Sequence, residues 1–316
     1  MTQPDLDRPL LGIALMLGFC VLAPFADAMA KLLGPHLAVG QLVTLRFAVQ
    51  ALILVPLTLA TGRAWRMDRR TLGLVALRTL LHILGIGLVF TSLLYLPLAD
   101  AIAIAYVMPF VLLLLGFWFL GEEVGLRRLA ACAVGFAGTL MVVQPAFSQV
   151  GWPALLPLGV AVIFALFMLV TRQIAGRTDP IGMQAVSALM ALALLVPVMA
   201  LTPADTLPQL AWIAPTAQGW TLVALMGITG TGAHLLMTWS LRYVPASTVA
   251  PMQYLEIPFA TVVGFALFGD LPGPLAACGI AVTIAAGLYI ILRERAMHRA
   301  RPPVPQAIHS GTPPAG

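Results

Sequence analysis

Charged residues are scarce in this 316-residue chain, where Asp, Glu, Lys and Arg together make up 9% of the sequence. A soluble domain carries about 25% charged residues. This scarcity therefore excludes the pair of soluble domains that the length alone would suggest. Hydrophobic residues make up 60% of the chain, and the mean hydropathy is +0.98. Because a helix of about 20 apolar residues crosses a bilayer, the composition predicts an integral membrane protein.

Cysteine is also scarce, and its placement excludes several kinds of site. The three cysteines, Cys20, Cys132 and Cys278, are far apart, each lies inside an apolar run, and no Cys-x-x-Cys occurs. Nothing therefore supports a disulfide framework, a zinc site or an iron–sulfur cluster, and we expect no metal and no other cofactor. The net charge of +5 does not indicate a nucleic-acid partner, because the basic residues are spread between apolar runs, as in membrane proteins.

What the chain has in abundance is apolar runs, and these predict an all-α, polytopic membrane protein with ten transmembrane helices. The predicted spans are Leu11–Leu33, Val39–Ala60, Leu72–Leu94, Ala99–Leu120, Leu129–Val143, Leu155–Arg172, Ile181–Leu201, Trp220–Leu241, Ser247–Phe268 and Pro274–Leu292. Residues 1–10 form a short N-terminal segment. The tail Arg293–Gly316 is rich in Pro and Arg and is predicted to be disordered.

The first run could also be the apolar core of a signal peptide, with Ala28-Met29-Ala30 as its cleavage site. The acidic residues Asp5 and Asp7 before the run, and its continuation to Leu33, favour a retained span.

The distribution of basic residues predicts the orientation. Fourteen arginines fall on one side of the ten-span pattern, at the two ends and in alternate connections, whereas Lys31 alone falls on the other side. Cytoplasmic connections of membrane proteins carry the excess of Lys and Arg. We therefore expect both termini in the cytoplasm, which requires an even number of spans.

The chain also repeats itself. The segment Tyr95–Tyr106 matches Tyr243–Tyr254 at a shift of 148 residues, with Tyr, Pro and Tyr at corresponding positions. The two halves are residues 11–143 and 155–292, with five spans each. Because five is odd, the second half must enter the membrane from the opposite side. Inverted repeats of this kind are the basis of alternating access in many secondary transporters.

Several short motifs, in this order, resemble those of the drug/metabolite transporter superfamily, EamA type. The matching features are Asp27-Ala-Met-Ala-Lys31, Arg46-Phe47, the Ala-rich start of span four leading to Pro109, Leu120-Gly-Glu-Glu123, its echo Phe268-Gly-Asp270, and the Gly-rich fifth and tenth spans. The second half departs from the pattern in having Asp270 where the family usually shows Glu.

The resemblance implies an EamA-like repeat in each half and a multi-pass carrier of the cell inner membrane with a central cavity. Its partners would be a small-molecule substrate and the lipid bilayer, and the chain would act as a monomer or homodimer. Family members are associated with amino acids and their derivatives, nucleobases, vitamins and S-adenosylmethionine, in either direction. Tyr254-Leu-Glu-Ile-Pro258 together with Asp27 and Lys31 resembles the riboflavin or S-adenosylmethionine uptake branch more than the amino-acid exporters.

Ionisable residues inside a span are costly and are therefore candidates for function. Asp27 and Arg46 both lie roughly 9–11 Å below the outer surface of their predicted spans, and Lys31 follows Asp27 by one turn. Equal depth permits an ion pair that only stabilises the two charges. The alternative is that Asp27 or Arg46 contacts a charged substrate.

Glu256 lies about 13–14 Å into span nine, near the middle of the bilayer. The corresponding first-half positions, Val107 and Met108, are apolar, so the repeat does not impose an acid here. A buried carboxyl group can take up and release a proton, which suits proton coupling or a cationic substrate. It could instead be a permanently protonated group bonded to a neighbouring helix.

Prolines inside spans predict kinks that free backbone carbonyls, and such carbonyls at mid-membrane must face protein or a water-filled cavity. Structural kinks are an equally ordinary explanation. The predicted kink residues are Pro24, Pro109 and Pro258, and the predicted cavity wall adds Tyr106, Tyr254 and Gln253.

Four further features have mainly structural interpretations. Arg78 is close enough to the inner face to extend to it, and His82, one turn deeper, is a candidate for substrate binding or coupling. His234 stands alone in its span and is expected to hydrogen-bond at a helix contact rather than to bind a ligand. Trp239 fits the inner aromatic belt, although it could also stack on a ring-shaped substrate. The run Gly227–Gly232 imitates a dinucleotide fingerprint, but inside an apolar span it indicates close helix packing.

Two other functions compete with a secondary transporter. A membrane-embedded enzyme would need clustered catalytic groups, whereas the Asp and Glu inside the spans lie singly in different halves, and no Gly-x-Ser-x-Gly motif occurs. A passive channel would not need an inverted repeat. The sequence therefore favours a transporter and not an enzyme.

Overall fold

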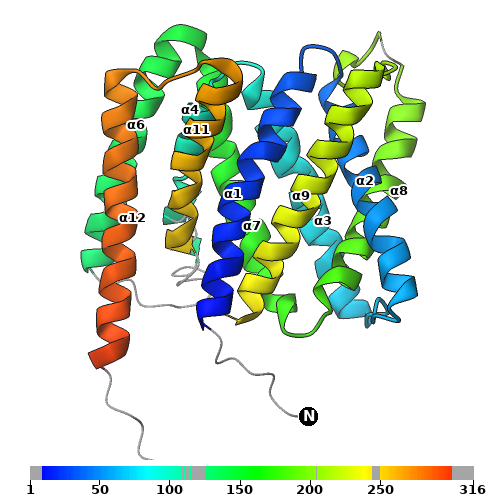
Figure 1. Cartoon of the computed structure of the whole chain (residues 1–316), viewed down its shortest axis with the longest axis horizontal. Helices are drawn as coiled ribbons and strands as arrows, with labels where there is room; N and C mark the ends of the chain where they lie inside the picture. Colours follow the sequence, from blue (N-terminus) through cyan, green and yellow to red (C-terminus); the bar gives the residue numbers. More distant parts are fainter. Residues whose placement is uncertain are drawn as a thin grey trace, which may run out of the picture.

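The computed structural model describes residues 9–108, 110–111, 114–115, 126–203, 205–243 and 250–300, and every regular element among them is helical. The α-helices are α1 (Pro9–Leu33), α2 (Val39–Ala60), α3 (Arg69–Leu93), α4 (Leu98–Ala105), α6 (Leu126–Val150), α7 (Leu156–Ala175), α8 (Pro180–Leu201), α9 (Ala217–Tyr243), α11 (Glu256–Phe268) and α12 (Pro274–Ala300). Short 3-10 helices are η1 (Trp152–Leu155), η2 (Pro208–Leu210) and η3 (Ala250–Leu255). Figure 1 shows a bundle in which the long helices run roughly side by side.

Seven helices of the described residues are long and apolar enough to cross a membrane, and two shorter apolar stretches, Gln253–Phe268 and Pro274–Ala286, accompany them. Most predicted spans agree with the helices within a few residues, and α2 has the predicted bounds Val39–Ala60. Apolar runs therefore located the helices well, because a run of about 20 apolar residues has few other stable structures in a bilayer.

The largest differences lie at helix ends. The predicted fifth span ends at Val143, but α6 continues to Val150. The prediction that the tail is disordered from Arg293 onward is wrong for its first eight residues, because α12 continues to Ala300. The added segment, Arg-Glu-Arg-Ala-Met-His-Arg-Ala, consists mostly of good helix formers, and the first proline comes only at position 302. Hydropathy finds where a span leaves the apolar layer, but not where its helix stops.

The predicted ninth span is not one continuous α-helix. Ala250–Leu255 form a 3-10 helix, and α11 begins only at Glu256. Pro258 lies in the first turn of α11, directly after the 3-10 helix, so the helix changes its geometry close to the predicted kink. Pro24 does lie inside α1, whose helix continues on both sides of it. Pro109 and the Leu120-Gly-Glu-Glu123 motif are outside the described residues.

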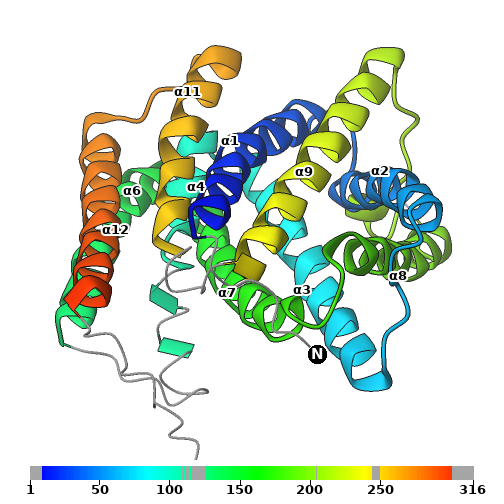
Figure 2. The same cartoon turned by 60° about the horizontal axis from the view of Figure 1, so that its bottom comes forward.

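Figures 1 and 2 show the same lateral order of helices: α6 and α12 form one edge, α2 and α8 the other, and α1, α3, α7 and α9 lie between them. The packed pairs include α1 with α9 and α3 with α7, as well as α1 with α11 and α7 with α4. The pairs α2–α8, α4–α11 and α6–α12 each join one helix from residues 11–143 to one from residues 155–292. The two halves are therefore interleaved through the whole bundle.

The α6–α12 edge is held by close backbone contact. A Cβ on Gly279 of α12 would lie 2.5 Å from the carbonyl oxygen of Gly138 on α6, and a Cβ on Gly138 would lie 2.8 Å from the carbonyl oxygen of Gly279. Thr283 Oγ1 donates to the Gly279 carbonyl at 2.9 Å. Small residues that let two backbones approach are the usual means of helix association in membranes.

Two ion pairs join the halves at opposite ends of the bundle. At the upper end in Figure 1, where α1 ends, Lys31 Nζ lies 2.9 Å from Asp270 Oδ2. At the lower end, where α1 begins and α12 ends, Arg63 Nη1 lies 2.9 Å from Asp179 Oδ2. The backbone is also tight at this lower end, because a Cβ on Gly182 would lie 2.3 Å from the carbonyl oxygen of Ala64.

Two aspartates cap helices at the lower end. Asp68 accepts hydrogen bonds from the backbone N–H groups of Arg70 and Thr71 at the start of α3, and Asp179 does the same for Ile181 and Gly182 at the start of α8. Asp68 also accepts a bond from the Thr71 hydroxyl. These bonds, with that of the Thr71 hydroxyl the largest, hold the pKa of Asp68 below its ordinary value.

Candidate functional site

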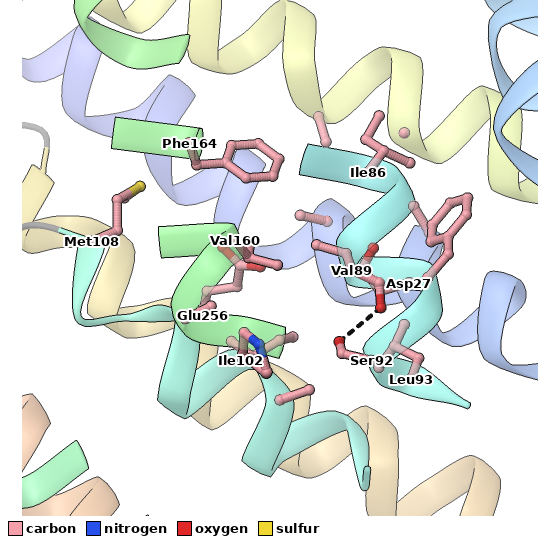
Figure 3. Close-up of a pocket in the computed structure, with 18 of the residues that line it drawn as sticks. Asp27, Ile86, Val89, Ser92, Leu93, Ile102, Met108, Val160, Phe164 and Glu256 are labelled. Atoms are coloured by element: carbon pink, nitrogen blue, oxygen red, sulfur yellow. Dashed lines mark hydrogen bonds between the residues drawn. The ribbon is translucent and has the colours of Figure 1, made fainter. Parts of the chain in front are cut away.

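A cavity lies inside the bundle among α1, α2, α3, α4, α7, α9 and the η3–α11 junction (Figure 3). Its volume is about 110 Å³, enough for several waters or part of a small metabolite. Its polar wall residues are Asp27, Arg46, Ser92, His234, Gln253 and Glu256. The remaining wall is apolar or aromatic, which is typical of small-molecule sites.

The cavity is not centred along the length of the bundle but extends toward one of its two ends. It is lined by the last part of α3, from Ile86 to Leu93, and by the first half of α7, from Pro157 to Phe164. Both stretches lie toward the end of the bundle that carries Lys31 and Asp270. The cavity therefore extends from the middle of the bundle, at His234 and Glu256, toward the end with Lys31 and Asp270.

Glu256 lies at the first turn of α11, on the cavity wall and 6% exposed. The Tyr106 hydroxyl, from the residue that follows α4, donates a hydrogen bond to its Oε2. The rings of Tyr106 and Tyr254 lie 5.5 Å apart between centroids, and Gln253 adds a buried Oε1 without a hydrogen-bond partner among the described residues. The predicted wall residues Tyr106, Gln253 and Glu256 do meet, with Tyr254 packed behind them.

Asp27 and Arg46 line the same cavity but form no ion pair within 4 Å among the described residues. Arg46, 2% exposed, instead donates to Gln50 Oε1 at 3.3 Å and to the carbonyl oxygen of Gly230 at 3.2 Å. A Cβ on Gly230 would lie 3.1 Å from Arg46 Nε, so this glycine makes room for the guanidinium. The glycine run of α9 thus serves packing, as predicted, and here it packs against a charged group.

Lys31 does not interact with Asp27 as its spacing suggested. Its ammonium group pairs with Asp270 and lies 4.6 Å from the centre of the Phe268 ring. Asp27 remains on the cavity wall (Figure 3), to which Ser92 of α3 also belongs, with its hydroxyl donating to the carbonyl oxygen of Val89. The carboxylate of Asp27 is therefore available to a ligand in the cavity.

His82 and His234 lie side by side, with their Nε2 atoms 3.3 Å apart. His234 therefore makes the helix contact that was expected of it, because α3 and α9 come together at this point and His82 is its partner. Arg78, one turn before His82, is 0% exposed. It does not extend to the inner face, because its side chain bonds to Thr171 of α7 and Ser187 of α8.

Trp239 lies away from the cavity, packed with Leu54, Ile181 and Ala185. Sequence reasoning missed the aromatic wall residues Phe19, Phe90 and Phe164, and also the buried glutamines Gln50 and Gln184, which lie behind the wall, where Gln50 is hydrogen-bonded to Arg46 and to Gln184. Polar residues inside apolar runs were a usable signal for the glutamines. The phenylalanines could not be identified from the sequence, because the same apolar residue types face lipid, the core and the cavity.

The cavity wall can hold a small molecule with both charged and ring-shaped parts. Asp27 and Glu256 suit cationic or hydrogen-bond-donating groups, Arg46 suits an acceptor, and the aromatic residues suit a ring. Within the described residues, no group of three or more His, Cys, Asp or Glu side chains could hold a metal ion.

Comparisons with known proteins give the context for this cavity. The profile of the EamA-like transporter family matches residues 10–144 and 151–293, which together include every helix that lines the cavity. A riboflavin transporter of Rhizobium johnstonii is 31% identical over 246 residues, covering 74% of this chain and 78% of that protein. An S-adenosylmethionine uptake transporter of Rickettsia bellii is 25% identical over 285 residues, covering 90% and 94%. The pseudopaline exporter CntI of Pseudomonas aeruginosa is 26% identical over 286 residues, covering 89% and 95%.

One solved crystal structure superposes on the chain with a TM-score of 0.64 at 18% identity, covering 91% of this chain and 97% of the other. At that identity the likeness concerns the fold alone. The three relatives named above carry the names of transporters.

Proposed function

Because this chain belongs to the EamA-like transporter family, we propose that it is a secondary transporter that moves a small polar metabolite across the inner membrane by alternating access. The observation that carries the proposal is the cavity, whose wall combines Asp27, Arg46 and Glu256 with aromatic side chains. Ionisable groups gathered inside the membrane mark a substrate or ion pathway. Helices from both matched segments build that wall.

The proposed architecture is ten spans in two inverted five-helix repeats. Its support is the pattern of packing: when each helix of residues 11–143 is exchanged for its counterpart in residues 155–292, α1–α9 becomes α7–α3 and α1–α11 becomes α7–α4, both of which occur. The α2–α8, α4–α11 and α6–α12 pairs map onto themselves. This is the behaviour of two halves related by a pseudo-two-fold axis.

The proposed orientation places both termini in the cytoplasm. Residue 9 and residue 300 lie at the same end of the bundle in Figure 1, and the arginine-rich connections lie there too. In this orientation the cavity extends from the middle of the bundle toward the outer side of the membrane. Reporter fusions to each end test the orientation, and fusions that report opposite compartments would contradict it.

We expect a substrate of the riboflavin or S-adenosylmethionine type, taken up from outside. The relatives with those names support this choice, and both molecules join a flat ring system to a polar chain, which fits an aromatic wall with Asp27, Arg46 and Glu256. Export of an amino acid derivative is the second candidate, supported by the similarity to the pseudopaline exporter.

Counterflow in proteoliposomes tests the function directly. Vesicles preloaded with unlabelled riboflavin or S-adenosylmethionine should accumulate the labelled compound from outside, whereas protein-free vesicles should not. Accumulation of neither compound would reject the uptake assignment, and counterflow of amino acid derivatives alone would favour the exporter. An Arg70→Gln variant serves as the control, because Arg70 is exposed at the start of α3, away from the cavity.

A further inference from the structure

Arg78 is a buried cation without an anion. It is 0% exposed, yet its partners are two neutral hydroxyl groups: Nε donates to Thr171 Oγ1 at 2.9 Å and Nη1 to Ser187 Oγ at 3.3 Å. Its guanidinium carbon lies 4.5 Å from the centre of the Phe167 ring. No Asp or Glu in the described ranges pairs with it. Buried charges in proteins are normally paired, so this one calls for an explanation.

The surroundings of Arg78 hold an excess of hydrogen-bond donors. Its Nη2 has no partner in the described part of the chain, and neither has Nδ1 of His82 or of His234. Because the two Nε2 atoms face each other at 3.3 Å, one neutral ring donates through Nε2 and the other must carry its proton on Nδ1. The cluster therefore offers the two N–H bonds of Nη2 and one imidazole N–H, all needing an acceptor.

The cluster adjoins the cavity through His234 and extends from it toward the inner end of α3. His234 lines the cavity and contacts His82, and His82 follows Arg78 by one turn of α3. Phe167 contacts all three side chains, at 4.8 Å from the ring of His82 and 6.1 Å from that of His234. On the cavity side, Arg46 bonds the carbonyl of Gly230, one turn before His234. Two guanidinium groups thus flank the histidine pair.

We propose that the transported metabolite carries an oxyanion, and that Arg78 with the His82–His234 pair binds this group on the inner side of the cavity. The proposal rests on the transport function proposed above and specifies its substrate class. An oxyanion supplies several acceptor lone pairs and a negative charge, and a guanidinium holds it through paired, charge-assisted hydrogen bonds. The substrate reaches this subsite when alternating access opens the bundle on the inner side of the cavity.

Position 187 supports this reading. Arg46 is the eighth residue of α2, and Ser187 is the eighth residue of α8, its counterpart in the proposed repeat. At this position the first half has an arginine, Arg46, whereas the second half has a serine, Ser187. The guanidinium that lies at Ser187 comes from another helix, because Arg78 of α3 donates to its hydroxyl. The two arginines therefore occupy related places on either side of the histidines.

Paired ligands that differ only in the anion test the proposal on the wild-type protein. The probes are S-adenosylmethionine against its decarboxylated form, for a carboxylate, and flavin mononucleotide against riboflavin, for a phosphate. Binding to purified protein is measured by thermal shift and titration. We expect the member that carries the carboxylate or phosphate group, in at least one pair, to bind about 10- to 100-fold more tightly, the factor for a charge-assisted hydrogen bond. Equal binding within both pairs would overturn the proposal.

Two substitutions test whether Arg78 is the residue that binds the oxyanion. Arg78→Gln should remove that preference, whereas Arg70→Gln on the same helix should keep it. Ser187→Asp places a carboxylate beside Arg78 as an internal substitute for the ligand. It should raise the melting temperature and abolish the anion preference, so the test remains if Arg78→Gln does not fold. A preference that survives Ser187→Asp would overturn the assignment to Arg78.

The outcomes separate this proposal from the transport function. Tight binding of an anionic probe without counterflow would reject transport and keep the subsite. Counterflow of both members of each pair at equal affinity would reject the subsite and keep transport. Absence of binding by every anionic probe would reject the subsite.

Discussion

The cavity wall and the contact between α6 and α12 are both buried, but the wall contains charged side chains, whereas the helix contact is made by small residues. The wall contains Asp27, Arg46 and Glu256, which are expensive to hold in a membrane. The α6–α12 pair instead brings two backbones together at Gly138 and Gly279 and satisfies its threonines locally. Among the described residues, the buried charges of the cavity wall and of Arg78 thus lie in the central part of the bundle, whereas the α6–α12 edge acts as a frame.

This difference predicts that substitutions at the α6–α12 contact reduce stability, whereas substitutions in the cavity wall reduce transport. The largest effect should come from the α6–α12 contact. In Gly279→Val the new side chain would meet the Gly138 carbonyl, which cannot move without separating α6 from α12. We expect a loss of stability of about 3 kcal/mol, in the range for overpacked interiors, visible as a smaller monodisperse fraction and a lower melting temperature in detergent. Gly273→Ala is the control, because a Cβ there meets nothing within 4 Å. A stable Gly279→Val protein would contradict the frame.

In the wall, Glu256→Gln should impair transport and leave the fold intact. The glutamine can still accept a hydrogen bond from Tyr106 but cannot release a proton. We expect uptake to fall about tenfold or more, which corresponds to about 1.4 kcal/mol in the transport barrier, and the remaining uptake to lose its pH dependence. Uptake across a pH series in proteoliposomes measures both effects. Unchanged pH-dependent uptake would reject a coupling role for Glu256.

The pair Asp27 and Arg46 distinguishes a structural clamp from two independent contacts. Because no direct ion pair joins them, we expect Asp27→Asn and Arg46→Gln each to reduce uptake about tenfold. The double variant should show roughly the product of the two losses, as for groups that are not in contact. A double variant that transports better than either single one would show that the two charges mainly neutralise each other.

The smallest effect should come from a helix cap outside both regions. Asp68→Ala removes the acceptor at the start of α3 and should lower the melting temperature by about 2 °C, with uptake unchanged. Because the pKa of Asp68 is lowered in the folded protein, its contribution is complete above the ordinary value of about 4 and is lost as the pH falls through the lowered value. The wild type and the variant should therefore converge in stability in acid. A constant difference at all pH values would contradict the assignment.

The α6–α12 contact and the cavity wall also differ in how much of each could be predicted from the sequence. Gly227–Gly232 were correctly assigned to packing, but the glycine pair of α6 and α12 could not be identified as a contact, because spacing on one helix does not reveal its neighbour. Asp27, Arg46 and Glu256 were identified as candidates because charge inside an apolar run is conspicuous. Lys31 and Trp239 were assigned to the same site and lie elsewhere, since their side chains depend on which helices adjoin them.

By itself, the sequence determined the class of molecule and the position of most helices, because a bilayer accepts few structures for an apolar run and repels charge wherever it occurs along the chain. Only the tertiary structure decided which polar groups meet: Tyr106 with Glu256, Lys31 with Asp270, and His82 with His234. These contacts join residues from different helices of the two halves. Their geometry depends on how the helices cross and rotate, which is set by the packing of apolar side chains that look alike in a sequence.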